Sequence, residues 1–259
     1  MSAPAPLMRR AAVEGLGTAA LVTVVVGSGI QATALSHDVG TQLLANSLAT
    51  VFGLGVLIAF LGPVSGAHFN PAVTLAAWFT GRDTGDGPAL RDVAAYVPAQ
   101  AAGAIGGAVL ADAMFGKPLL VLSTHERWAA HLWLAEVVAT AGLVWLVFGL
   151  ARAGRAHLAP LLVASYIGAA YWFTSSTSFA NPAVTIGRAF TDTFAGIAPT
   201  SVLPFLAAQL TGAAAGLCLV AVCFGRPAAP GGDEMGVVPH ADRQPVAPAR
   251  PAEESALAR

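Results

Sequence analysis

Residues 68–74 read HFNPAVT and residues 179–185 read FANPAVT, so one phrase occurs once in each half of the chain. Asn is favoured immediately before a helix and Pro at its first position, so each copy predicts a helix start. Two matched starts in a strongly apolar chain indicate short helices that begin inside a membrane, at a transport site. The two tripeptides consist of Asn70, Pro71, Ala72, Asn181, Pro182 and Ala183.

The composition indicates a protein embedded in a lipid bilayer. Of the 259 residues, 56% are hydrophobic and 10% are charged, whereas soluble domains carry about 25% charged residues. The net charge of −1 indicates no nucleic-acid partner and no acidic ligand. Cys218 and Cys223 match neither a metal-binding nor a disulfide pattern and are interpreted as ordinary membrane-helix residues. No cofactor and no bound metal are expected.

Six segments are long and apolar enough to suggest spanning helices, which need roughly 20 mainly apolar residues. These segments are 11–34, 43–61, 93–111, 132–150, 158–173 and 201–224. The first is not interpreted as a signal peptide, because it is long and contains Glu14. The sequence therefore predicts an all-α membrane protein with six transmembrane helices.

The basic residues predict the orientation, because cytoplasmic loops of membrane proteins carry an excess of Lys and Arg. One side would hold Arg9, Arg10, Arg82, Arg91, Arg152, Arg155 and Arg226, and the other Lys117, Arg127 and Arg188. We therefore expect a multi-pass protein of the cell membrane with both termini cytoplasmic. Residues 1–10 would form the cytoplasmic N-terminus. The Pro-, Ala- and Gly-rich residues 226–259 would form a disordered cytoplasmic tail.

The two halves of the predicted membrane domain, 11–115 and 130–225, share more than the tripeptide. Matching residues early in each half are Glu14 and Thr18, and Glu136 and Thr140; matching residues in the third spans are Gln100, Gly103, Ala104 and Gly107, and Gln209, Gly212, Ala213 and Gly216. Three spans per half mean that the second half starts from the opposite side of the membrane. This inverted 3+3 repeat predicts a pathway near the bilayer midplane.

An ionisable residue inside a span is costly and usually faces the protein interior or a cavity. We expect Glu14 and Glu136 each to accept hydrogen bonds from the irregular loop of its own half and so to hold that loop in place. A proton relay is the alternative role for these carboxylates.

After the second and fifth spans the chain is expected to turn back, with irregular segments at 62–69 and 174–180 and half-helices at 71–80 and 182–190. Irregular backbone at membrane depth occurs where it lines a cavity or is buried in protein. The two re-entrant half-helices would meet with their positive N-terminal ends together, which repels cations. The side-chain amides of Asn70 and Asn181 would donate to a passing solute oxygen.

Over residues 9–225 these features resemble the aquaporin and glycerol-facilitator family, also called major intrinsic proteins. The resemblance implies an aquaporin-like fold and a homotetramer in which each subunit has its own pore for water or small neutral solutes. The string at 179–185 is similar to a bacterial aquaglyceroporin-like subgroup associated with arsenic resistance and with arsenous acid or methylated arsenicals. His68 is expected to brace its loop and not to bind a metal, because no second ligand lies at a suitable spacing.

One position departs from the family pattern. The family's aromatic/arginine filter places an Arg directly after the second tripeptide, where this chain has Val184. Loss of the guanidinium would widen the constriction. Arg188 follows one helical turn later on the same face. It would either reach back into the filter, remain a plain charge of the outer vestibule, or attract polar and anionic solutes to the mouth.

Three further filter positions are predicted from the alignment with the family. Ser178 precedes the second Asn by three residues, and Phe52 corresponds to the second-span position. Tyr171 corresponds to the fifth-span position, with Ala170 or Trp172 as alternatives. Anchoring at the membrane interface is an alternative role for Tyr171 and Trp172.

The pattern as a whole predicts a passive channel for water and small neutral solutes, with glycerol-like polyols and arsenous acid as candidates. An ion-coupled secondary transporter is the alternative, because such transporters also use broken helices and inverted repeats. A membrane protein with a closed pore that acts through its tetramer contacts is a third. An enzyme is not expected, since no nucleophile–base set is recognisable.

Overall fold

The computed structural model describes residues 5–82 and 87–225, and all regular secondary structure in them is helical. The predicted tail at 226–259, Arg226 and the first residues of the predicted N-terminal segment lie outside the described residues. Six long helices are α1 (Leu7–Leu35), α2 (Val39–Ser65), α4 (Leu90–Met114), α5 (Ala130–Arg152), α6 (Ala159–Phe173) and α8 (Pro199–Phe224). Two short ones are α3 (Pro71–Gly81) and α7 (Pro182–Arg188), and a 3-10 turn, η1 (Ala156–Leu158), precedes α6.

The six long segments, with η1 counted into α6, are long and apolar enough to cross a membrane. Each begins and ends within a few residues of its predicted segment. One boundary was predicted wrongly, because α2 continues to Ser65 and the irregular segment begins only at Gly66. Pro63 is accommodated near the end of this helix, and Gly66, with φ of 94°, terminates it in the left-handed conformation that favours glycine.

The long helices pack in two equivalent pairs, α1 along α4 and α5 along α8. The glycines predicted from the repeat lie in these contacts. A Cβ atom at Gly103 or Gly107 would collide with the backbone of α1, and one at Gly212 or Gly216 with the backbone of α5. Small residues are therefore required for these close approaches, as in other helix pairs in lipid.

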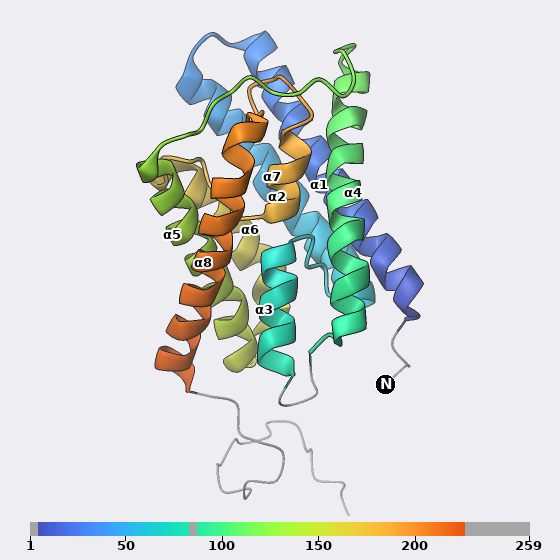
Figure 1. The fold of residues 1–259 in the computed structure, drawn as a ribbon, viewed down its shortest axis with the longest axis vertical. Helices are drawn as coiled ribbons and strands as arrows, with labels where there is room; N and C mark the ends of the chain where they lie inside the picture. The colour runs from blue at the N-terminus through green and yellow to red at the C-terminus, as the bar shows by residue number, and fades with distance from the viewer. Residues whose placement is uncertain (1–4, 83–86, 226–259) are drawn as a thin grey trace, which may run out of the picture. The chain divides into compact units, whose positions relative to one another are not determined.

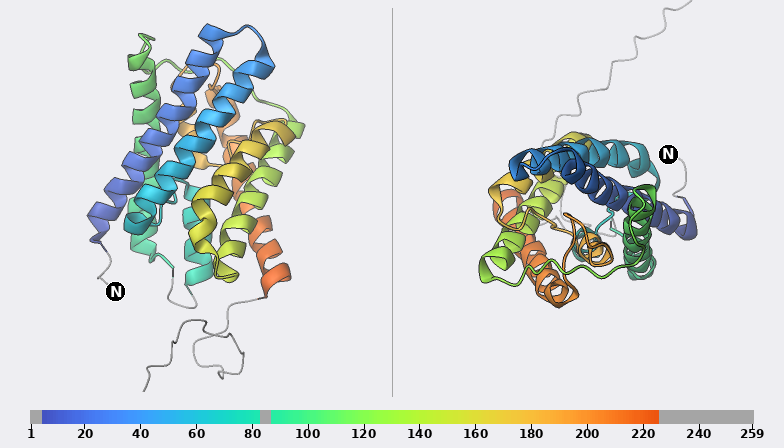
Figure 2. Two further views of the ribbon diagram at one scale, coloured as in Figure 1. Left: turned by 180° about the vertical axis from the view of Figure 1, so that it is seen from behind. Right: turned by 90° about the horizontal axis from the view of Figure 1, so that it is seen from above.

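The short helices α3 and α7 lie one above the other between α4 and α8, with their N-terminal ends facing (Figure 1). Viewed from above, α7 lies between α4 and α8, with the other long helices behind it (Figure 2). Helix α1 begins and α8 ends at the same end of the bundle, which we call the terminal end; α3 runs toward it. We call the opposite end, toward which α7 runs, the far end.

Candidate functional site

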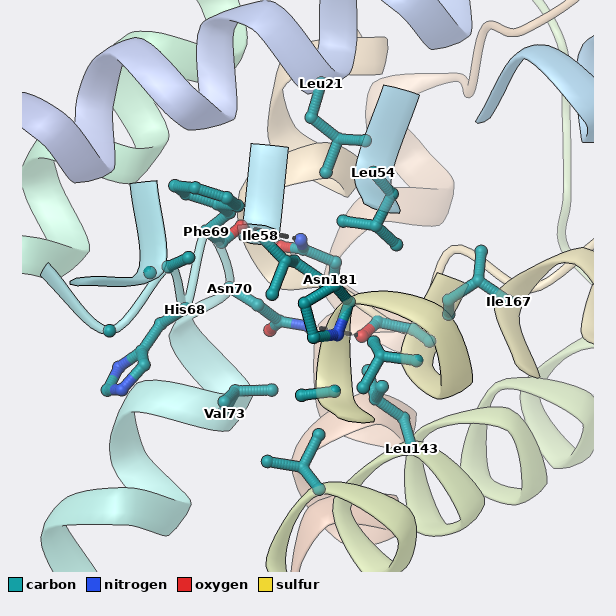
Figure 3. Close-up of a pocket in the computed structure, with 18 of the residues that line it drawn as sticks. Leu21, Leu54, Ile58, His68, Phe69, Asn70, Val73, Leu143, Ile167 and Asn181 are labelled. Carbon is teal, nitrogen blue, oxygen red and sulfur yellow. Dashed lines mark hydrogen bonds between the residues drawn. The ribbon is translucent and has the colours of Figure 1, made fainter. Parts of the chain in front are cut away.

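A cavity of about 550 Å³ runs past the point where α3 and α7 meet, and both Asn70 and Asn181 border it. Much of its wall is aliphatic. The aliphatic side chains around the two asparagines are Leu21, Leu54, Ile58, Val73, Leu143 and Ile167 (Figure 3). The two amides are thus the polar groups of an otherwise apolar stretch.

The two asparagines have the same environment. The side-chain oxygen of each accepts from the backbone N–H two residues further along, at 2.9 Å for Asn70 and 3.0 Å for Asn181. Nδ2 of Asn70 donates to the Ala180 carbonyl at 2.7 Å, and Nδ2 of Asn181 donates to the Phe69 carbonyl at 2.8 Å (Figure 3). Because an amide has two N–H donors and each of these uses one, the second is left for a molecule in the cavity.

The other tripeptide residues fit the helix starts. Pro71 and Pro182 occupy the first helical position, where no backbone N–H is needed. Ala72 and Ala183 supply the N–H groups that hold the asparagine side chains, and both are fully buried.

Both irregular segments contain left-handed residues at equivalent positions. Ala67 and Phe69 have φ of 50° and 49°, and Ser178 and Ala180 have φ of 50° and 47°. Such conformations cost about 1–3 kcal/mol each for residues other than glycine and persist only where surrounding contacts hold them. Buried carboxylates make those contacts.

The fully buried Glu14 holds the segment before Asn70. Its oxygens accept from the backbone N–H groups of His68 at 3.0 Å and Phe69 at 2.6 Å. They also accept from the Ser65 hydroxyl at 2.6 Å and from Nε2 of Gln100 at 2.8 Å. This carboxylate therefore satisfies donors that would otherwise be orphaned at membrane depth.

Glu136, also fully buried, repeats this arrangement in the other half. Its oxygens accept from the N–H groups of Phe179 at 2.9 Å and Ala180 at 2.8 Å, and from Nε2 of Gln209 at 2.7 Å. Neither Glu14 nor Glu136 is among the residues that border the cavity. The geometry favours the loop-holding role over the proton relay.

His68 borders the cavity on the side of α3. Its Nδ1 lies 3.1 Å from the Thr74 hydroxyl, and its ring meets the Tyr96 ring edge-on at 5.8 Å. These contacts fix the ring against α3 and α4. Among the described residues there is no cluster of three or more metal-ligating side chains.

On the far side of the asparagines, Tyr171, Ser178 and Val184 all border the cavity and are buried. The Tyr171 hydroxyl lies 3.1 Å from the Thr50 hydroxyl. Because Thr50 donates to the Asn46 carbonyl at 2.8 Å, it accepts from Tyr171. The hydroxyl oxygen of Ser178 has no hydrogen-bond partner among the described residues.

The structure corrects the prediction for Phe52. That side chain is 69% exposed and does not border the cavity, whereas Thr50 and Leu54 do. Residues two apart on a helix do not share a face, so a placement two residues off turns the side chain outward. Trp172 is likewise half exposed, and Ala170 is buried away from the cavity lining. Tyr171 is therefore the α6 residue of this stretch that reaches the cavity.

Arg188, at the end of α7, is buried and borders the cavity. Its Nε donates to the Ala195 carbonyl, and its Cζ lies 3.4 Å from the centre of the Phe179 ring. Arg127, from the segment between α4 and α5, lies over the same ring at 5.0 Å. Burial lowers the pKa of Arg127 from its ordinary value, and the Glu136 charge opposes this shift. Arg188 is thus part of the cavity wall.

The model of the family described as "Major intrinsic protein" matches residues 2–180. The chain belongs to this family. Among its major intrinsic protein relatives, aquaglyceroporin AqpS of Rhizobium meliloti (strain 1021) is 51% identical over 214 residues, which are 83% of this chain and 89% of the relative. The propanediol uptake facilitator PduF of Citrobacter freundii is 31% identical over 153 residues, 48% of this chain and 55% of the relative.

Solved structures show the same major intrinsic protein fold. The aquaglyceroporin from Plasmodium falciparum superposes with a TM-score of 0.61 at 20% identity, covering 84% of this chain and 98% of that one. The predicted family and the all-α fold are therefore confirmed. The protein is a multi-pass membrane channel for water and small solutes and not an enzyme, which confirms the predicted passive channel ahead of the ion-coupled transporter.

Two residues of the site in this major intrinsic protein were not predicted from the sequence. Thr50 carries a usable signal, because it follows the polar Asn46 by four residues on one face of an otherwise apolar helix. Arg127 comes from an irregular segment and reaches Phe179 only through the tertiary fold, so no local pattern indicates it.

Proposed function

We propose that the cavity past Asn70 and Asn181 is a wide solute pathway that passes small neutral polyhydroxylated molecules as well as water. The candidate solutes are glycerol-like polyols and arsenous acid or methylated arsenicals. The observation that carries the proposal is Val184, an aliphatic side chain that borders the cavity directly after the second tripeptide. Valine contributes two methyl groups there and no charge or donor.

The cavity wall suits solutes with one polar and one apolar side. Asn70 and Asn181 offer N–H donors, and the irregular segments before them, which border the cavity, are expected to offer backbone carbonyls. Leu21, Leu54 and Ile167 offer only contact surface. A polyol can therefore exchange its water contacts for those of the amides and carbonyls, while its carbon atoms lie against the aliphatic side.

Charged solutes meet an unfavourable environment at the same point. The N-terminal ends of α3 and α7 face each other and carry partial positive charge. Ions would also lose hydration in an apolar stretch without a carboxylate in its lining. Arsenous acid is neutral at pH 7 and close to glycerol in size and hydroxyl presentation, so it avoids both costs. Two relatives, an aquaglyceroporin and a propanediol uptake facilitator, support solutes of this kind.

The assembly belongs to the same proposal. We expect a homotetramer in the cell membrane with the terminal end cytoplasmic, and an inverted repeat of residues 11–115 and 130–225. Large apolar side chains such as Phe52 and Phe60 lie exposed on α2, where lipid or a second copy would cover them. Arg9, Arg10, Arg91, Arg152 and Arg155 belong to helices or turns at the terminal end, which supports its cytoplasmic placement.

Stopped-flow light scattering on proteoliposomes tests the solute range. The purified protein is reconstituted and exposed to osmotic gradients of sucrose, glycerol and arsenous acid, with protein-free liposomes as the baseline. We expect fast flux of water, glycerol and arsenous acid. Fast water flux with baseline glycerol and arsenous acid flux would contradict the wide pathway and would mean that Tyr171 or Arg188 closes the constriction.

A further inference from the structure

The far part of the cavity contains hydrogen-bonding capacity that the protein itself does not use. The Arg188 side chain is 4% exposed and Ser178 is 3% exposed, and both border the cavity. Among the described residues, the guanidinium uses only Nε in a hydrogen bond, and the Ser178 hydroxyl has no partner. Both terminal nitrogens of Arg188 are therefore left for a molecule in the cavity, whereas the Ser178 oxygen has no partner but is itself covered.

Arg188 is held in one orientation although its terminal nitrogens are unused. Nε donates to the Ala195 carbonyl, and the guanidinium lies 3.4 Å from the centre of the Phe179 ring. That ring is itself fixed, because it packs edge-on against Phe205 at 5.3 Å and its backbone N–H donates to Glu136 at 2.9 Å. A stacked guanidinium with a fixed fork of donors is preorganised for oxygen atoms.

Neither guanidinium at this point forms an ion pair within the described part of the chain, although the carboxylate of Glu136 lies near enough to attract both; that carboxylate already accepts hydrogen bonds from Phe179, Ala180 and Gln209. Among residues 5–82 and 87–225, the single ion pair joins Arg10 to Asp92 and involves neither Arg188 nor Arg127. Arg127 is placed beside the Phe179 ring by a hydrogen bond from its Nε to the Gly196 carbonyl at 3.1 Å. Two cations therefore stand near one ring, and their fields add in a low-dielectric surrounding.

We infer that Arg188, with Arg127 as a supporting charge, is the solute-oxygen-binding and cation-excluding group of the far constriction, whose wall also includes Ser178. The family pattern places a guanidinium at position 184, where this chain has valine. The guanidinium of Arg188 lies one helical turn further along. The chain therefore combines an aliphatic, wide position next to the second tripeptide with a retained positive charge further along the same face. This inference rests on the proposed function, because it assigns a role within the same pathway.

The displacement has a physical consequence for selectivity. A guanidinium that is set back by one turn leaves room for a solute of glycerol size beside Val184. Its charge still acts on cations, because electrostatic repulsion extends further than steric contact. Width and charge selectivity are thus carried by two different residues, and separate substitutions should change them independently.

Cation leak in proteoliposomes tests the assignment. The proteoliposomes contain a pH-sensitive dye, and a potassium gradient with valinomycin drives proton entry; methylammonium uptake is measured in parallel. Arg188→Leu should raise both leaks by about tenfold, the lower range of effects produced by a focused charge. Arg188→Lys should keep most of the exclusion, because it retains the charge. Arg127→Leu should give a smaller rise, since Arg127 does not border the cavity.

Arg155→Leu is the matched control, because Arg155 is exposed at the terminal end and outside the cavity lining. An Arg188→Leu channel with normal water flux and wild-type leak would overturn the inference. If Arg188→Leu does not reconstitute, Arg188→Gln decides in the same way: a raised leak supports the inference, and a wild-type leak overturns it. Water and glycerol flux of the wild type reports separately on the proposed function.

Discussion

The irregular segments before Asn70 and Asn181 share a backbone but differ in what lies beyond it. Ala67 and Ser178 have the same φ, the two asparagines hold each other's loops, and Val73 and Val184 follow the tripeptides as equivalent residues. Seven residues after each Asn, however, Ala77 borders the cavity in one half and Arg188 in the other. The two halves thus share the scaffold of the pathway and differ in polarity at single positions.

The side chain two residues before each Asn shows the same division. His68 contacts Thr74 and Tyr96 within its own half. The ring of its equivalent, Phe179, lies against the guanidiniums of Arg188 and Arg127. The backbone N–H of each of these residues donates to the buried carboxylate of its own half. A shared backbone contact therefore supports two different side-chain environments, one around an imidazole and one around two stacked guanidiniums.

The largest effect is expected at Glu14 and Glu136, which make equivalent contacts in the two halves. Glu14→Gln and Glu136→Gln each replace one carboxylate oxygen by an N–H₂ group, which faces at least one backbone N–H of the loop. A buried donor without an acceptor costs about 1–3 kcal/mol. Both variants should therefore lose stability by comparable amounts, measured as thermal unfolding in detergent, with water flux retained in the fraction that folds.

A much larger loss in one half would break the equivalence of the two carboxylates. Loss of a proton-coupled flux at unchanged stability would instead favour the proton relay. Thr23→Val serves as the control, because Thr23 bonds only backbone carbonyls, of Ala19 and Gly107, away from both loops.

The second effect concerns the equivalent valines. Val184→Arg should narrow the far constriction and lower glycerol flux by about tenfold, the discrimination that a small change of pocket size gives. Water flux should fall less, because water is smaller. Light scattering on proteoliposomes measures both. Val184→Ile, which adds a methylene without charge, is the size control; equal loss of water and glycerol flux at matched protein levels would contradict the placement of the constriction at Val184.

The same comparison explains which features could be predicted from the sequence. Features that occur in both halves were predictable: six spans, two half-helices, the paired asparagines and the carboxylates that hold the loops. Features that occur once were not. Phe52 was placed by aligning a short motif, and an error of two residues reversed the face. Arg127 depends on the fold of the segment between α4 and α5, whose backbone is tied to Ser201 by a hydrogen bond of 2.9 Å.

The paired amides provide a third, smaller test. Asn181→Asp and Asn70→Asp each place a carboxylate beside the facing N-terminal ends of α3 and α7, which weakens the repulsion of cations. Proton leak under a potassium potential should rise severalfold and by similar amounts in both variants, since the two side chains have equivalent contacts. A rise in one variant alone would indicate that the other asparagine does not face the pathway.

The smallest effect is expected at Tyr171, whose hydroxyl lies in the part of the cavity toward the far end. Tyr171→Phe removes the donor to Thr50, while Thr50 keeps its bond to the Asn46 carbonyl. The net worth of one such bond is about 0.5–1.5 kcal/mol, so the fold should persist. The cavity loses an acceptor for solute hydroxyls, and glycerol flux should fall by less than about fivefold relative to water flux. The ratio of glycerol flux to water flux from the two light-scattering measurements checks this.

Thr50→Val is the control, because it removes the partner but leaves the Tyr171 hydroxyl, and it should leave the flux ratio nearer to wild type. A larger change in Thr50→Val would mean that Thr50, and not Tyr171, contacts the solute.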